Sequence, residues 1–113
     1  MHELSIALSI LEIAESHARA QGASVIRKIK IRAGQFSGVE KDALEFSLEA
    51  ARAGTLAASS IMEIEIVPVA LECRWCGPVA ACIEDFSLLC PNCSAVCTVT
   101  AGRELEVEYI EVD

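Results

Sequence analysis

Hydrophobic and polar residues follow two different periods along this chain, and each period predicts a different kind of element. Between residues 4 and 20 the apolar side chains recur every three or four positions, the period of an amphipathic helix. Gly22 follows this run and provides a helix stop. A second helical pattern runs from residue 43 to about Gly54. Ser37 and Glu40 have the spacing of a capping box, which predicts that this second helix begins there.

Three further segments alternate apolar and charged residues at every second position, the period of a half-buried strand. The first, residues 25–33, has cations on its polar side, whereas the second, 62–66, and the third, 104–109, have glutamates there. Two helices covering the apolar face of a three-stranded sheet form an α+β layer. The simplest order places the second and third strands side by side. Cross-strand pairs of opposite charge would add about a few tenths of a kcal/mol each.

Four cysteines lie between the second and third strands in the pattern CxxC–x13–CxxC, namely Cys73, Cys76, Cys90 and Cys93. Two such pairs can surround one cation as a tetrahedron of sulfur ligands, the geometry of structural zinc. Two disulfides or four unconnected buried thiols are the alternatives. Residues 71–102 are too few to fold unaided, and structural zinc supplies ~10–16 kcal/mol in small peptides. We therefore predict an inserted zinc-ribbon-like domain over 71–102, and an α+β domain over 1–70 that is completed by strand 103–113.

Three residues of this insertion lie outside the expected ligand set. Cys82 and Cys97 do not fit the paired spacing, and we expect them to be small buried apolar residues. A further ligand or a redox-sensitive thiol is the alternative role for them. Trp75 stands between two of the ligands, and we expect it to pack over the zinc knuckle.

Composition and charge restrict the possible functions. The chain has 113 residues, of which 53% are hydrophobic, but its apolar stretches are too short and too interrupted by charge to cross a bilayer. The start of the chain lacks the features of a signal peptide, so we expect a cytoplasmic protein whose cysteines bind metal. A net charge of −8 argues against nucleic-acid binding. A hydrolytic zinc enzyme would need an open coordination position and a general base, and four thiolates close the site.

The chain begins Met1-His2-Glu3-Leu4-Ser5. A free α-amine, the backbone amides that follow it and an imidazole can together surround a metal in a plane, an arrangement that suits Ni(II) or Cu(II). From these residues alone, a chance histidine is the stronger interpretation. Three features change that interpretation when they are taken together: the opening pentapeptide, the segment AGQFSGV at 33–39, and the cysteine pairs followed by GREL at 102–105.

This combination resembles the HypA/HybF family, the nickel metallochaperones of [NiFe]-hydrogenase maturation, over essentially the whole chain. The chain has Gln35 where the family commonly has Glu, and Ser94 where the family commonly has Gly, and neither residue is an expected ligand. The resemblance implies a nickel site in which His2 supplies imidazole, Met1 its terminal amine and Glu3 a backbone nitrogen. The Glu3 carboxylate has an equally good alternative role near the helix dipole.

Two other residues are candidate nickel ligands. Asp42 matches a position proposed as a further nickel contact in some relatives, but an acid in the first turn of the second helix is the preferred interpretation. His17 would lie roughly 22 Å from His2 along an intact helix, too far to share a metal. We expect His17 to be solvated on the helix face.

The implied function is a non-catalytic carrier with structural zinc. It would accept Ni(II) from a nucleotide-hydrolysing partner and deliver it to the hydrogenase large-subunit precursor. Two other classes remain: a zinc-ribbon adaptor that binds protein but no nickel, and a thiol redox switch built on Cys82 and Cys97. Coupling between the two metal sites is a further hypothesis. An exposed edge strand could support a homodimer.

Overall fold

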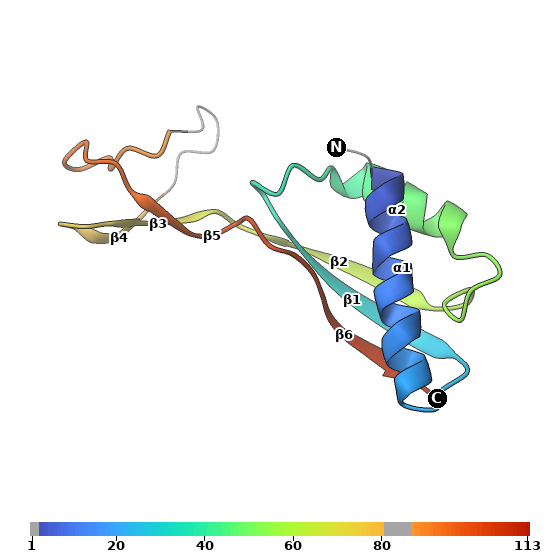
Figure 1. Ribbon diagram of the computed structural model, residues 1–113. Coiled ribbons are helices and arrows are strands. Elements are labelled where there is room, and N and C mark those ends of the chain that lie inside the picture. The colour runs from blue at the N-terminus through green and yellow to red at the C-terminus, as the bar shows by residue number, and fades with distance from the viewer. Residues whose placement is uncertain (1–2, 81–86) are drawn as a thin grey trace.

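The computed structural model describes residues 3–80 and 87–113. The molecule is elongated, about 54 × 25 × 17 Å, with both helices at one end and a small second sheet at the other (Figure 1). Along the chain the elements are α1 (Glu3–Ala20), β1 (Ile26–Gly34), α2 (Lys41–Ala51), β2 (Ile61–Val67), β3 (Ala70–Cys73), β4 (Gly77–Val79), β5 (Thr98–Ala101) and β6 (Leu105–Val112). Helices and small sheets confirm the predicted α+β class.

The main sheet has the order β2-β1-β6, so the expectation that the second and third predicted strands are neighbours is wrong. Strand β1 lies between them. It is parallel to β2, with Ile31 opposite Ile64, and antiparallel to β6, with Ile31 opposite Val107. Helix α2 makes the crossover that two parallel strands require. The last residue of β2, Val67, lies opposite Gly34, and the first residue of β6, Leu105, lies opposite Ala33. The two strands therefore lead into the insertion from the same end of the sheet.

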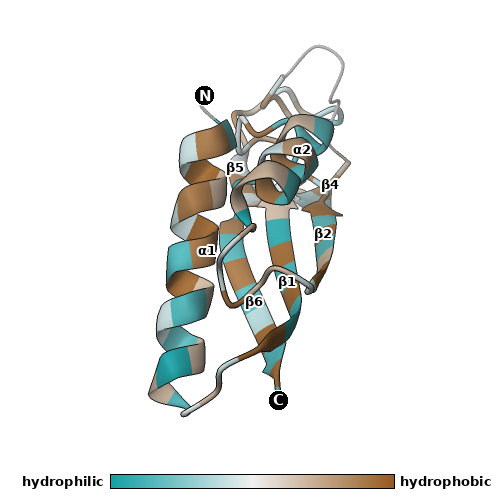
Figure 2. Ribbon diagram, turned by 90° about the vertical axis from the view of Figure 1, so that its right-hand side faces the viewer, coloured by the Kyte–Doolittle hydropathy of each residue, from teal (hydrophilic) through white to brown (hydrophobic). Residues whose placement is uncertain are grey.

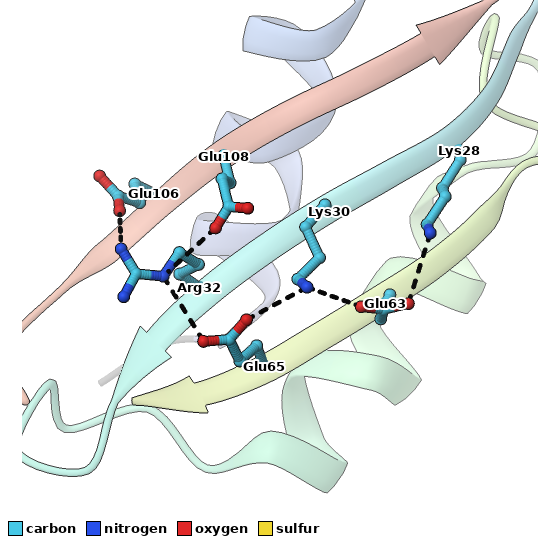
Figure 3. Close-up of polar contacts among 7 residues, drawn as sticks. All are labelled: Lys28, Lys30, Arg32, Glu63, Glu65, Glu106 and Glu108. Carbon is cyan, nitrogen blue, oxygen red and sulfur yellow. Dashed lines mark hydrogen bonds and ion pairs between the residues drawn. The ribbon is translucent and has the colours of Figure 1, made fainter. Parts of the chain in front are cut away.

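Charge on the outer face explains why β1 is central. Its cations meet glutamates on both neighbouring strands (Figure 3). Lys30 Nζ lies 2.7 Å from Glu63 and 3.1 Å from Glu65 on β2. Arg32 lies 3.1 Å from Glu106 and 3.3 Å from Glu108 on β6. Pairing β2 directly with β6 would instead place rows of glutamate opposite each other, which destabilises a sheet.

The inner face of this sheet is apolar and packs against both helices. Figure 2 shows the alternation of hydrophobic and hydrophilic residues along the strands. Ile29, Ile31 and Ala33 of β1 are buried, as the alternating pattern predicts. Leu44 and Leu48 are buried on α2, and α1 contributes a second set of buried side chains: Ala7, Ile10, Leu11, Ala14 and Ala18. The alanines let α1 approach the core closely, since they add little side-chain volume.

The end of α1 agrees with the prediction from the sequence, whereas the start of α2 differs from it. Helix α1 ends before Gly22, whose φ of +73° is the left-handed conformation typical of a helix stop. Helix α2 begins directly after Glu40, whose carboxylate accepts a hydrogen bond from the N–H of Ala43 at 2.6 Å. The predicted capping box is therefore wrong. Gly38 has a φ of +81°, so the chain turns there and Ser37 cannot cap the helix.

A second sheet has the order β4-β3-β5 and a separate apolar core. This core contains Val69, Leu71, Cys73, Cys90 and Cys97. Among residues 3–80 and 87–113, neither helix combines the length and the apolar character that crossing a bilayer requires.

Candidate metal centres

Each cysteine pair lies in a tight turn of the second sheet region. Cys73 ends β3 and Cys76 directly precedes β4, so the first pair spans the turn of the β3–β4 hairpin. The second pair spans a turn that is closed by the N–H of Cys90, which donates to the carbonyl of Ala95 at 2.7 Å. Ser94 completes that turn with a φ of +65°. Glycine would adopt this conformation without strain, which accounts physically for the glycine common at this position in the family the sequence resembles.

The two turns bring all four sulfurs together, as the spacing predicts. The ligand atoms of Cys73, Cys76, Cys90 and Cys93 lie within 4.8 Å of one another, and the sulfurs of Cys73 and Cys93 are 3.5 Å apart. Bonded sulfurs would be ~2.05 Å apart, and none of the four is in a disulfide. Four sulfurs each ~2.3 Å from a central zinc would be roughly 3.8 Å apart. The cluster therefore fits a closed tetrahedral zinc site.

Backbone amides stabilise the negative charge that a zinc ligand must carry. The N–H groups of Cys76 and Trp75 lower the pKa of Cys73 to about 6. Burial disfavours the Cys90 thiolate, but the N–H groups of Asn92 and Cys93 outweigh it and lower its pKa. The thiols of Cys93 and Cys90 hold the pKa of Cys76 at about 12 when no metal is present. One thiolate in each pair is thus favoured by the fold, and a bound cation would favour the others.

For the other residues of the insertion, one prediction is confirmed and one is wrong. Cys97 is buried, as predicted, and burial raises the pKa of its thiol. Cys82 lies outside the described residues. The expectation for Trp75 is wrong, because its side chain is 73% exposed. Its ring faces the guanidinium of Arg74 at 5.1 Å, and the turn that points both sulfurs inward leaves the residues between them outside.

A junction between the two sheets is the part of the site region that sequence reasoning missed. We use "junction" for residues 34–36, 67–69 and 102–104. Gly34 donates its N–H to the carbonyl of Glu104 at 2.7 Å, and Phe36 donates to the carbonyl of Gly102 at 2.6 Å. The side-chain oxygen of Gln35 accepts from the N–H of Val69 at 2.8 Å. The end of β1 is thereby bonded to both chain segments that lead into the second sheet.

Two glycines permit this close approach. A Cβ on Gly34 would lie 2.0 Å from the carbonyl oxygen of Gly102. A Cβ on Gly102, whose φ is +108°, would lie 2.7 Å from the Cα of Val69. Beyond them, the Phe36 ring packs against the core of the second sheet although it follows β1 in sequence. Glycines at the ends of two strands were the available sequence signal for close backbone approach.

The predicted nickel ligands are covered only in part. Met1 and His2 lie outside the described residues, so the N-terminal site stays a prediction. Glu3 is the first residue of α1 and is half-buried, and Asp42 is exposed in the first turn of α2, where the helix-dipole interpretation places it. His17 is exposed on α1, as predicted.

Fold and cysteine site together define an α+β metal-binding protein whose second sheet carries a closed four-cysteine centre. Comparison with known families then identifies it. The chain belongs to the HypA family, whose model is described as hydrogenase/urease nickel incorporation, metallochaperone, and matches residues 1–112. Members of this family are metallochaperones for hydrogenase maturation that bind nickel and structural zinc, and the resemblance noted from the sequence is confirmed.

Individual relatives agree over nearly their full length. The chain is 40% identical to the hydrogenase maturation factor HypA of a Roseiflexus species, covering 100% of this chain and 93% of the relative. It is 37% identical to HypA of Acidithiobacillus ferrooxidans, with 100% of both chains covered. The solution structure of the Ni metallochaperone HypA from Helicobacter pylori superposes with a TM-score of 0.71 at 26% identity, covering 99% of this chain and 97% of the other.

Proposed function

We propose that this chain binds Ni(II) at its N-terminus and delivers it to the [NiFe]-hydrogenase large-subunit precursor. Membership of the HypA family over residues 1–112 is the observation that carries the proposal. A nucleotide-hydrolysing protein of the same maturation pathway is the proposed donor of nickel. The family description also includes urease, and hydrogenase is the target proposed for this chain because its relatives are hydrogenase maturation factors.

The proposed nickel ligands are the imidazole of His2, the terminal amine of Met1 and the backbone nitrogen of Glu3. Helix α1 begins at Glu3, and the first N–H groups of a helix have no partner within the helix. The Glu3 nitrogen is therefore not needed to hold α1 together, so a metal can replace its proton, which is released to solvent. Such a nitrogen-rich set suits planar Ni(II).

The proposed zinc ligands are Cys73, Cys76, Cys90 and Cys93, and the proposed role of zinc is structural. All four coordination positions would be taken by sulfur, so no position is left for a substrate. We propose a zinc domain over residues 71–102 and a nickel domain over 1–70 and 103–113. Separate apolar cores on the two sheets support a division into two units, with Phe36 and Val69 of the nickel domain contributing to the second core.

One observation supports a different role. Trp75 is 73% exposed on the zinc knuckle, and an exposed tryptophan is a common anchor of protein interfaces. A zinc-ribbon adaptor that binds protein but no nickel would use this surface. It predicts that replacing His2 leaves metal content unchanged.

Nickel titration of the zinc-loaded protein with its native N-terminus separates these functions. No residue should precede Met1, because an extension would turn the terminal amine into an amide. We expect equimolar nickel uptake with the absorbance of a planar site, and loss of that uptake in His2→Ala. The matched control is His17→Ala, which removes the exposed histidine of α1 and should bind nickel like the wild type.

The pH dependence gives a second readout. Nickel needs both the imidazole and the amine unprotonated, so affinity should fall as pH drops through about 6.5. Equal nickel binding by the wild type and His2→Ala, or affinity that does not change with pH, would reject the N-terminal site and leave the adaptor role.

A further inference from the structure

The helical layer of the main sheet is wider than the sheet that it covers. Three strands about 4.8 Å apart span roughly 14 Å, whereas two helices packed about 10 Å apart need roughly 20 Å. Helix α2 lies over the middle of the sheet, and α1 lies beside the β6 edge (Figure 2). A strand added next to β6 would therefore lie under α1.

A groove lies at this position. One cavity of about 340 Å³ is lined by Ile13 and His17 of α1 and by Val107, Ile110 and Val112 of β6. A second cavity, of about 300 Å³, shares Ile13 and Val107 with the first and continues toward the start of β6. We call the two cavities together the α1–β6 groove. Half of its lining residues are aliphatic, and Glu106 and Glu108 of β6 are among the polar residues that complete it. The groove follows β6 along its length.

The backbone beside the groove is available for pairing. Strand β6 pairs with β1 on one side, and no other described strand pairs with it on its second side. An edge strand of this kind presents a row of backbone N–H and C=O groups to an incoming chain. An extended segment that pairs there would place alternate side chains in the groove on either side of the register shift between Val107 and Tyr109, as in the addition of a strand to a sheet edge.

Charge decides which segment fits. The ion-pair ladder of Figure 3 combines three cations with four glutamates, two of them, Glu106 and Glu108, on β6. Arg32 is shared among three of these carboxylates. Glu111 is exposed and adds a further carboxylate on the side of β6 that faces Lys28. The outer side of this edge is therefore acidic.

A second copy of the chain fits this edge poorly. Antiparallel pairing of β6 with itself, with apolar residues in both grooves, would bring glutamates opposite glutamates, and like charges in that position destabilise a sheet. Lysine or arginine at the same positions would meet Glu106, Glu108 and Glu111 favourably. We propose that the β6 edge and the α1–β6 groove bind an extended segment of a partner protein in which apolar and basic residues alternate.

The test uses the full zinc-loaded chain and a synthetic octapeptide of alternating valine and lysine with both ends blocked. Amide chemical shifts and hydrogen exchange are followed by NMR. We expect protection of the amides of β6 and no change at β2, the opposite edge, which also carries glutamates. Raising the salt concentration should weaken binding, because the recognition is partly electrostatic.

Three variants test the contacts. Ile13→Lys places a charge in both cavities and should weaken binding by roughly tenfold or more. Leu8→Lys is the matched control, since Leu8 is as exposed on the same helix and lines neither cavity, so binding should be unchanged. Glu111→Lys should weaken binding of the lysine peptide and improve binding of the same peptide made with glutamate.

Several outcomes overturn the proposal. They are the absence of peptide binding, equal binding of the lysine and glutamate peptides, protection at β2 instead of β6, and binding that survives Ile13→Lys. A concentration-dependent dimer that Ile13→Lys dissociates would assign the edge to a second copy. His2→Ala should leave peptide binding unchanged, so this surface and the nickel proposal can fail separately.

Discussion

Replacing Gly34 with alanine should destabilise the protein more than any ordinary change of glycine to alanine in a strand. The new Cβ would lie 2.0 Å from the carbonyl oxygen and 2.1 Å from the carbonyl carbon of Gly102. Both are backbone atoms, so rotating a side chain cannot relieve the overlap. The end of β1 and the segment between β5 and β6 must move apart.

The magnitude follows from what that movement breaks. Two backbone hydrogen bonds cross the overlap, from Gly34 to Glu104 and from Phe36 to Gly102, and each contributes about 1 kcal/mol net. Overpacking with a backbone shift costs a further ~1–3 kcal/mol. Alanine offsets about 0.5–1 kcal/mol of this, because it loses less backbone entropy than glycine. The net loss is about 2–4 kcal/mol, a roughly 30- to 1,000-fold larger unfolding constant.

Urea unfolding of the zinc-loaded protein, followed by circular dichroism with zinc in excess, measures this loss. The control is Gly54→Ala. Gly54 has a φ of +77° and nothing within 4 Å of its would-be Cβ, so only the left-handed backbone is penalised, at about 1–2 kcal/mol. If Gly34→Ala is no more destabilising than Gly54→Ala, the close approach at the junction is not what restricts this position.

Three other predictions concern the core, the metal centre and the charged face. Phe36→Ala removes a ring that packs against the second core, so it should speed zinc transfer to a chelator and lower the free energy of unfolding by about 2 kcal/mol. The control, Phe46→Ala, removes a ring that is 76% exposed and should change neither the transfer rate nor the free energy of unfolding. Cys76→Ser should abolish equimolar zinc binding measured by metal analysis, and Cys97→Ser should retain it, since Cys97 is outside the four-sulfur cluster; zinc lost equally from both would refute the ligand set. Hydrogen bonding to Lys30 lowers the pKa of Glu63 on β2, so this pair stabilises the fold above the unfolded pKa of glutamate, about 4.3, and the contribution is lost as pH falls through the lower folded pKa. Lys30→Met should therefore show a smaller loss of unfolding free energy between neutral and acid pH than the wild type, and parallel curves would contradict this.

The local periods were read correctly from the sequence. The first helix, the alternating faces of β1 and β2 and the cysteine turns all depend on residues within a few positions of one another. Their side-chain spacing is therefore visible without knowledge of the fold. The alternation predicted for β6, in contrast, is interrupted by a register shift that places Tyr109 opposite Lys30 on the charged face. The predicted capping box is wrong, and its cause is also local. Gly38 turns the chain inside the motif, and Glu40 caps the helix in place of Ser37.

Strand order, in contrast, was predicted wrongly from the sequence. A strand's pattern shows which face is buried, but it does not name the neighbouring strand. The cations of β1 and the glutamates of both other predicted strands contained the needed signal, because a central basic strand satisfies two acidic neighbours at once. Trp75 was misjudged because the direction of a side chain in a knuckle depends on where both sulfurs point.

The sequence by itself determined the α+β class, the four-cysteine site and, through resemblance, the family. Only the tertiary structure decided the junction of Gly34 with Gly102, the place of Phe36 in the second core, and the groove beneath α1. The reason is physical. Periodicity and ligand spacing arise from neighbours along the chain, whereas close backbone approach, shared cores and unfilled edges arise where distant segments meet.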